Sequence, residues 1–183
     1  MNEPLPIGFG QTISQPLAVA FMLELLNPKP GEHIMDVGAG SGWQTALLAY
    51  IVSKNGKSAS AGAVKKRKRI GTVVSMERIP ALRVMASHNI AKYNFIEKKA
   101  VKVVLGDASR GYAHEAPFDK IIVAASAASI PVAWKREVKV GGRIVAPVDG
   151  RVMVLNHRSH SDFDIIEYGG FRFVPLIEDE GGG

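Results

Sequence analysis

Three acidic residues stand at the ends of three predicted strands. Asp36 belongs to the apolar run HIMDV, which predicts a strand over 33–37, while Glu77 and Asp107 end the strands predicted over 72–77 and 101–107. In open α/β sheets, ligands bind outside the carboxyl ends of the strands. One such acid is common on a protein surface, but three at successive strand ends predict a small-ligand site along that edge.

A glycine-rich turn follows the first of these strands. Asp36 is followed by VGAGSG, which contains Gly38, Gly40 and Gly42, and a helix is predicted from Trp43 onward. Such a turn lets backbone N–H groups approach a ligand closely. The pattern is GxGxG and not the GxGxxG of dinucleotide sites. The acid beside the turn disfavours a pyrophosphate and suits an ammonium group, which S-adenosylmethionine carries on its amino acid end.

The other two acids fit the rest of that ligand. Glu77 lies 35 residues after Gly42, and without the 16-residue basic segment between them the spacing would be 19, close to the roughly 20 typical of an acid that holds ribose hydroxyls. Asp107 is expected to reach the adenine amino group. The competing interpretations are a purely structural glycine turn, a solvated Glu77 and a turn-capping Asp107. The three acids and the glycine turn together indicate an S-adenosylmethionine-dependent methyltransferase, and an NAD enzyme is the weaker functional alternative.

Several stretches resemble one methyltransferase family. Read in order they are IGFGQTISQP, DVGAGSGWQTALLA, VVSMERIPAL, VVLGDASRGYAHEAPFDKIIVAASAASIP and VGGRIVAPV, and GGFRFVPL is similar to the closing strand of the family. Together they resemble the protein-L-isoaspartate O-methyltransferase family over nearly all of residues 5–177, apart from the basic segment. IGFGQTISQP and GDASRGYAHEAPFD are the most specific of these motifs.

The resemblance implies a repair reaction. The family uses S-adenosylmethionine, which becomes S-adenosylhomocysteine, to methylate the free α-carboxylate of L-isoaspartyl residues in damaged proteins, and no metal takes part. The ester then collapses to a succinimide. By resemblance Ser14 is the active-site serine, and the substrate-binding residues are Gly8, Gly10, Gln11 and Thr12. The implied cofactor-binding residues are Phe9, Asp36, Gly38, Gly40, Gly42, Glu77, Asp107 and Ala108.

This reaction suits the residues of the IGFGQTISQP segment. A carboxylate with a pKa near 4 is already ionised at pH 7, so no general base is needed. Catalysis then depends on holding oxygen, methyl carbon and sulfur in line and on excluding water. We expect the segment to fold over the strand ends, with Ser14 and Thr12 donating hydrogen bonds to the carboxylate. Alternatively, Ser14 caps the helix that begins near Pro16.

The order of the predicted elements indicates how these residues are brought together. Helices are predicted over 17–26, 43–52, 80–94 and 130–138, and strands over 33–37, 72–77, 101–107, 119–125, 141–148, 151–159 and 163–176. Strands that alternate with helices indicate parallel βαβ units with both sheet faces covered. We predict an α/β, Rossmann-like methyltransferase fold. Its mainly parallel, seven-stranded sheet ends in an antiparallel hairpin, and residues 1–183 form a single domain.

Composition sets outer limits. Apolar residues make up 46% of the 183-residue chain and charged residues 22%, as in soluble globular proteins. The chain has no cysteine, which excludes disulfides and thiol catalysis and suits a reducing cytoplasm. We therefore expect a cytoplasmic monomer without a membrane span or a signal peptide. HRSH at 157–160 could be a metal site, but a polar turn is the stronger interpretation.

The net charge of +6 comes from one segment. Residues 54–69 carry seven basic side chains and no acid, so the rest of the chain has a charge of −1. We expect a solvated inserted loop; RNA binding there is the alternative, although no aromatic residues interleave for base stacking. Only seven residues precede Gly8, where family members carry tens more. Other hypotheses are therefore a methyltransferase of the same fold acting on RNA, and a non-catalytic S-adenosylmethionine-binding relic.

Overall fold

The parallel strands of a central sheet all have their carboxyl ends on the same side of the molecule. The computed structural model describes residues 2–54 and 70–178, so the predicted basic loop lies outside the described residues except for Lys54. Seven strands are hydrogen-bonded in the order β5-β4-β3-β6-β7-β8-β9. They span Val101–Leu105, Thr72–Glu77, His33–Val37, Phe118–Val123, Val138–Val148, Arg151–Ser159 and Asp162–Tyr168.

Five of these strands are parallel and the last two close the sheet. β5, β4, β3, β6 and β7 run in one direction, and β8 is antiparallel to both β7 and β9. Asp149 and Gly150 connect β7 to β8 with φ angles of 45° and 74°, as a tight hairpin turn requires. The predicted mainly parallel sheet with an antiparallel closing hairpin is confirmed.

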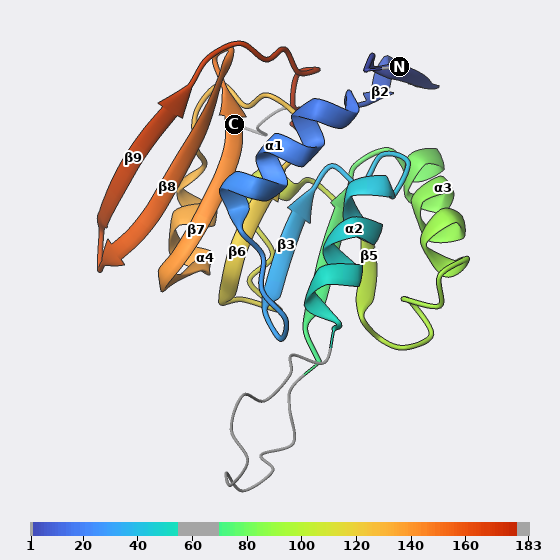
Figure 1. Cartoon of the computed structure of the whole chain (residues 1–183), viewed down its shortest axis with the longest axis horizontal. Helices are drawn as coiled ribbons and strands as arrows, with labels where there is room; N and C mark the ends of the chain where they lie inside the picture. Colours follow the sequence, from blue (N-terminus) through green and yellow to red (C-terminus); the bar gives the residue numbers. More distant parts are fainter. Residues whose placement is uncertain (1, 55–69, 179–183) are drawn as a thin grey trace, which may run out of the picture.

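Helices cover both faces of the sheet (Figure 1). Helices α1 (Pro16–Leu26), α2 (Trp43–Val52) and α3 (Pro80–Ala91) pack against one face. The other face is covered by α4 (Val132–Glu137) and the short 3-10 helix η1 (Ala108–Arg110). Successive residues of β3 alternate between the two cores, because Ile34 packs with α1 and α2 whereas Met35 packs with Trp134 of α4. This alternation follows from the two-residue period of a strand.

The first residues form a hairpin that the sequence did not predict. Strands β1 (Leu5–Gly8) and β2 (Gln11–Ile13) pair antiparallel as a separate two-stranded sheet. Phe9 and Gly10 connect them with φ angles of 57° and 69°. Figure 1 shows this hairpin at the end of α1, on the edge of the molecule toward which the arrow of β3 points.

Five predicted elements end earlier than expected. The strands predicted over 101–107 and 119–125 end at Leu105 and Val123, and the helix predicted over 130–138 covers Val132–Glu137. The helix predicted over 80–94 stops at Ala91 and is followed by turns, with Asn94 at a φ of 59°. The predicted strand over 163–176 was wrong after Tyr168, because Gly169–Gly170 interrupts it and Pro175 lacks a backbone donor. Beyond Tyr168 this segment forms only a bridge between Pro175 and Ser126.

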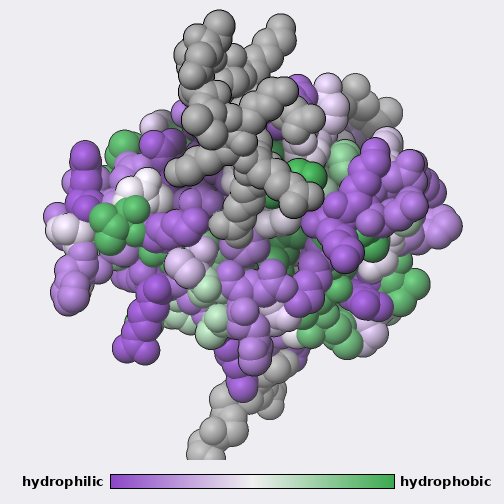
Figure 2. All heavy atoms as spheres, turned by 90° about the horizontal axis from the view of Figure 1, so that it is seen from below, coloured by the Kyte–Doolittle hydropathy of each residue, from purple (hydrophilic) through white to green (hydrophobic). Residues whose placement is uncertain are grey.

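The amino-terminal ends of the parallel strands lie on the opposite side of the molecule. Figure 2 views the molecule from the side of the amino-terminal strand ends, and that face is mostly hydrophilic with small separate apolar spots. None of the helices in the described ranges 2–54 and 70–178 is long and apolar enough to cross a membrane.

Candidate active site

A pocket opens at the carboxyl ends of the parallel strands, where the sequence predicted a ligand site. We call it the cofactor pocket. It lies between the glycine turn, the ends of β4 and β6, the start of η1 and the segment after β9. Its lining residues are Gln11, Thr12, Val37, Gly38, Gly40, Met76, Glu77, Arg78, Ile79, Leu82, Gly106, Ala108, Ala124, Ala125, Val174, Pro175, Leu176 and Ile177.

The glycine turn forms one wall of the cofactor pocket and Glu77 holds it in place. The backbone N–H groups of Gly38 and Ala39 donate to the carbonyl oxygen of Met76, at 2.9 and 3.0 Å. Glu77 Oε2 accepts from the N–H of Gly40 at 2.8 Å, and its Oε1 accepts from the N–H of Ile79 at 3.0 Å. The nearly buried Glu77 carboxylate therefore fixes the turn while it lines the pocket.

Asp36 lies behind the wall and not on it. Its carboxylate is fully buried and accepts from Gln44 Nε2 at 2.8 Å, from Thr45 Oγ1 at 2.6 Å and from Ser75 Oγ at 3.1 Å. Burial raises the pKa of Asp36, and these hydrogen bonds act against that rise. Asp36 does not line the cofactor pocket; it fastens α2 and β4 to the strand that carries the glycine turn.

The third acid also shapes the wall from behind. Asp107 Oδ1 accepts from the N–H and Oγ of Ser109, at 2.9 and 2.7 Å, and so caps η1. The adjacent Gly106 and Ala108 line the pocket, whereas Asp107 does not. Trp134 Nε1 donates to the carbonyl oxygen of Ala108 at 2.7 Å, which ties this part of the wall to α4.

The IGFGQTISQP segment divides into three parts. Gln11 and Thr12 of β2 line the cofactor pocket. Gly8, Phe9 and Gly10 form the hairpin tip outside it, and the Phe9 side chain is 61% exposed. Ser14 lies outside the cofactor pocket as well, in a second depression beside it.

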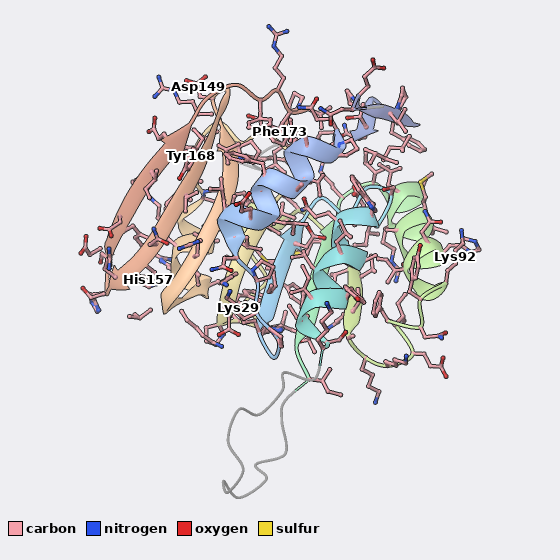
Figure 3. The ribbon with its side chains drawn as sticks, in the orientation of Figure 1. Lys29, Lys92, Asp149, His157, Tyr168 and Phe173 are labelled. Carbon is pink, nitrogen blue, oxygen red and sulfur yellow. The ribbon has the colours of Figure 1, made fainter. Side chains whose placement is uncertain are left out.

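We call this second depression the acceptor pocket, after the role that the sequence predicts for Ser14. It is lined by Pro4, Thr12, Ser14, Gln15, Gly170, Arg172, Phe173 and Val174. Thr12 and Val174 also line the cofactor pocket, so these two side chains form the boundary between the two spaces. Figure 3 shows Phe173 close to α1 on the same edge as the hairpin. The sequence predicts Ser14 at the ligand site. In the structure Ser14 lines the acceptor pocket, which shares a wall with the cofactor pocket.

The helix-capping interpretation of Ser14 has no support in the structure. The residue that caps α1 is Gln15, and no side chain of the cap accepts a hydrogen bond. The N–H of Leu17 instead donates to Oδ1 of Asn2 at 2.9 Å. The Ser14 hydroxyl is thus available to the acceptor pocket.

Two further features lie apart from both pockets. Gly42 caps α2 and packs under α3, where a Cβ atom would come within 3.0 Å of the carbonyl oxygen of Ala86. His157, in the HRSH motif, is buried near the start of β7, on the side of the sheet away from the two pockets (Figure 3). Its ring nitrogens lie 3.0 and 2.9 Å from the carbonyl oxygens of Val138 and His160. Among the described residues, no three metal-binding side chains cluster.

Sequence reasoning missed the apolar part of the cofactor pocket. Met76, Ile79 and Leu82 come from the end of β4 and the start of α3, and Val174 to Ile177 come from the segment after β9. The motifs VVSMERIPAL and GGFRFVPL contained most of these residues. VVSMERIPAL was interpreted as the end of a strand and the start of a helix, and GGFRFVPL as part of the closing strand, so neither was assigned to the pocket.

Known proteins of one family match this chain along its whole length. The family model for protein-L-isoaspartate(D-aspartate) O-methyltransferase matches residues 1–181. A protein-L-isoaspartate O-methyltransferase from Methanopyrus kandleri is 39% identical over 99% of this chain and 74% of its own length. One from Staphylothermus marinus is 40% identical over 99% of this chain and 77% of its own length.

A solved structure has the same fold. It comes from Plasmodium falciparum, is assigned to this family and holds S-adenosyl-L-homocysteine; its TM-score is 0.82 at 22% identity, over 98% of this chain and 82% of that one. Fold, pocket position and family match agree. The chain belongs to the protein-L-isoaspartate O-methyltransferase family.

Proposed function

We propose that this protein transfers a methyl group from S-adenosylmethionine to the free α-carboxylate of L-isoaspartyl residues in damaged proteins. One observation carries the proposal: a cofactor pocket with the glycine turn and Glu77 shares a wall with an acceptor pocket that contains Ser14. A bisubstrate reaction needs two adjoining spaces of this kind. Family membership supplies the identity of the two substrates.

The described residues suit an adenosyl ligand. Gly40 lines the pocket at a φ of 53°, a backbone conformation that favours glycine and lets the main chain approach a ligand closely. Apolar side chains such as Met76 and Leu82 offer a surface for an adenine ring, and Glu77 is placed to accept hydrogen bonds from ribose hydroxyls. We assign Gly38, Gly106 and Ala108 to close backbone contact with the same ligand.

The remaining predicted residues receive indirect or substrate-side roles in this proposal. Asp36, Asp107 and Gly42 position the wall from behind. Gly8, Phe9 and Gly10 stand at the hairpin tip, where an exposed aromatic ring and two glycines without side chains can meet a peptide. Gln11 lines the cofactor pocket, and Thr12 lies at the boundary of the two pockets.

The chemistry that this chain must supply is positioning. S-adenosylmethionine provides an electrophilic methyl group on a sulfonium cation. The acceptor carboxylate is already ionised at neutral pH, so no residue has to remove a proton. Ser14 and Thr12 donate hydrogen bonds that hold the carboxylate, and the boundary between the pockets aligns it with the methyl carbon. Opposite charges neutralise in this step, so exclusion of water by the two bound substrates favours it.

The wider setting is also a proposal. We propose a monomer with a single domain, which the continuous seven-stranded sheet supports, in the cytoplasm, whose reducing environment suits a chain without cysteine. RNA methylation rested on the basic segment, which lies outside the described residues beyond Lys54. The Lys54 ammonium itself lies 4.1 Å from the centre of the Tyr50 ring, away from the residues of both pockets.

The direct test uses labelled S-adenosylmethionine and two peptides that differ only in one isoaspartyl or aspartyl residue. We expect label to enter the isoaspartyl peptide alone. Release of that label as methanol after mild base treatment would identify a carboxyl methyl ester. Equal labelling of both peptides, or labelling of neither while S-adenosylhomocysteine still binds, would overturn the proposed function. The second result would favour the non-catalytic relic.

A further inference from the structure

The acceptor pocket contains one charged side chain whose role is unassigned. Among its lining residues, Arg172 is the only ionisable one, and the others are apolar, small or neutral polar. None of the ion pairs within the described part of the chain includes Arg172. An arginine with no ion pair among the described residues, beside a serine expected to bind an anion, is a candidate for substrate recognition.

The backbone around Arg172 is anchored on both sides. On one side, Phe171 stacks on Phe21 of α1 with ring centres 4.9 Å apart. On the other, Ser126 N–H donates to the carbonyl oxygen of Val174, and Leu176 N–H donates to that of Ser126, both at 2.7 Å. Arg172 therefore projects from a fixed stretch of chain, although this stretch belongs to no helix or strand.

The charges of the two pockets match the two reactants. The cofactor pocket holds the Glu77 carboxylate, and its one cation, Arg78, already has an interaction of its own. The acceptor pocket has a guanidinium and no acid. An arginine binds a carboxylate through two parallel N–H donors, which suits a substrate whose reacting group is a carboxylate.

The same contact would weaken after the reaction. Methylation converts the acceptor carboxylate into a neutral ester, so the ion pair with Arg172 is present before transfer and lost afterwards. Such a contact favours capture of the substrate and release of the product. Because it stabilises the anion before transfer, it contributes to binding and not to the rate of the chemical step.

We propose that Arg172 binds the α-carboxylate of the isoaspartyl residue and selects the acceptor by its charge. The proposal rests on the proposed function, since it concerns the acceptor of that reaction. Arg172 is a positioning residue for substrate, and Ser14 and Thr12 complete the hydrogen bonds to the same group.

The test compares Arg172→Lys, Arg172→Gln and Arg172→Glu with the unchanged protein. The substrate is an isoaspartyl peptide with blocked ends and uncharged flanking residues, so that the isoaspartyl carboxylate is its only anion. We expect KM for the peptide to rise in the order Arg, Lys, Gln, Glu, by roughly threefold to tenfold for Gln. We expect kcat to stay within about twofold. Gln and Glu have nearly the same shape, so a difference between them reports charge and not packing.

The dependence of KM on ionic strength and a variant distant from the pocket distinguish a direct ion pair at Arg172 from an effect of net charge. KM of the unchanged protein is expected to rise with ionic strength, and that of Arg172→Gln to respond less. Arg136→Glu, an exposed change on α4, alters the net charge equally and is expected to leave KM unchanged. S-adenosylhomocysteine affinity and the melting temperature report the fold and the cofactor pocket.

The outcomes distinguish two failures. If the unchanged protein methylates the isoaspartyl peptide but the Arg172 variants keep its KM, the role of Arg172 is wrong and the proposed function stands. If KM rises equally for Gln and Glu and S-adenosylhomocysteine affinity falls with it, Arg172 is structural and the proposal is overturned. If the unchanged protein labels no isoaspartyl peptide, the proposed function fails first.

Discussion

Ser14 can be tested because its two possible roles affect different measurements. If it binds the acceptor carboxylate, Ser14→Ala removes a hydrogen bond to substrate and lowers turnover on the order of tenfold. Since α1 is capped without the Ser14 side chain, the free energy of unfolding should change by less than about 0.5 kcal/mol. Turnover of the isoaspartyl peptide and urea denaturation measure the two effects.

Ser161→Ala is the matched control, because Ser161 is exposed in the turn between β8 and β9. It should change neither quantity. A Ser14→Ala variant that keeps full turnover but loses about 1 kcal/mol of stability would show that the capping interpretation was right after all.

The three acids show what single residues reveal and what they hide. Their positions at successive strand ends correctly indicated the edge of the sheet that carries the pocket. Only Glu77 lines it. Asp107 follows the end of β5 and caps η1, whereas Asp36 lies within β3, where side chains alternate between the two faces. Val37 lines the pocket, so its neighbour Asp36 must point to the opposite side, toward α2. The alternation was readable in HIMDV, but the three donors that bury Asp36 come from α2 and β4, and their approach depends on tertiary packing.

The helix pair α2–α3 depends on a glycine that the sequence assigned to ligand binding. Gly42 has a φ of 83°, and an added Cβ atom would lie 3.0 Å from both the carbonyl oxygen of Ala86 and Cγ1 of Ile90. Gly42→Ala therefore combines backbone strain with overpacking of α3. We expect it to destabilise the fold by about 2–4 kcal/mol, seen as a lower midpoint in urea.

Gly150→Ala separates the two contributions. Gly150 has a φ of 74° but nothing within 4 Å of an added Cβ atom, so only the backbone strain of about 1 kcal/mol applies. Equal losses for the two variants would mean that α3 moves aside without cost and that Gly42 is required by its φ alone.

Elements with a strong internal pattern were predictable, and those held by distant partners were not. HIMDV and WQTALLAYIV gave the correct bounds of β3 and α2 because apolar runs next to glycine or proline define their own ends. The hairpin β1–β2 was missed, since its three to four residues per strand and partly exposed side chains show no clear alternation. The segment after Tyr168 reads as a strand, but it pairs with Ser126 only at one point.

Titration of the buried carboxyl group of Asp36 affects the stability of the whole molecule. Burial raises the pKa of Asp36 above its ordinary value of 3.8. Between that value and the raised pKa, the folded protein binds more protons than the unfolded chain. The free energy of unfolding therefore falls as pH rises through this window. Asp119 acts in the opposite sense: burial opposes its ionisation, but hydrogen bonds from Lys139 and from the His33 N–H outweigh this and lower its pKa.

Asp36→Asn isolates the contribution of Asp36, because Asp119 is common to both proteins and cancels in the difference. An asparagine amide can still accept from Gln44 and can donate to the hydroxyls of Thr45 and Ser75, so the local packing is preserved. Urea midpoints measured from pH 4 to pH 8 should show the variant gaining stability relative to the unchanged protein as pH rises, until the raised pKa is passed. Asp162→Asn, at an exposed position, should show a flat difference. A flat difference for Asp36→Asn as well would mean that its three hydrogen bonds fully offset burial, and that the glycine turn is supported by an ordinary carboxylate.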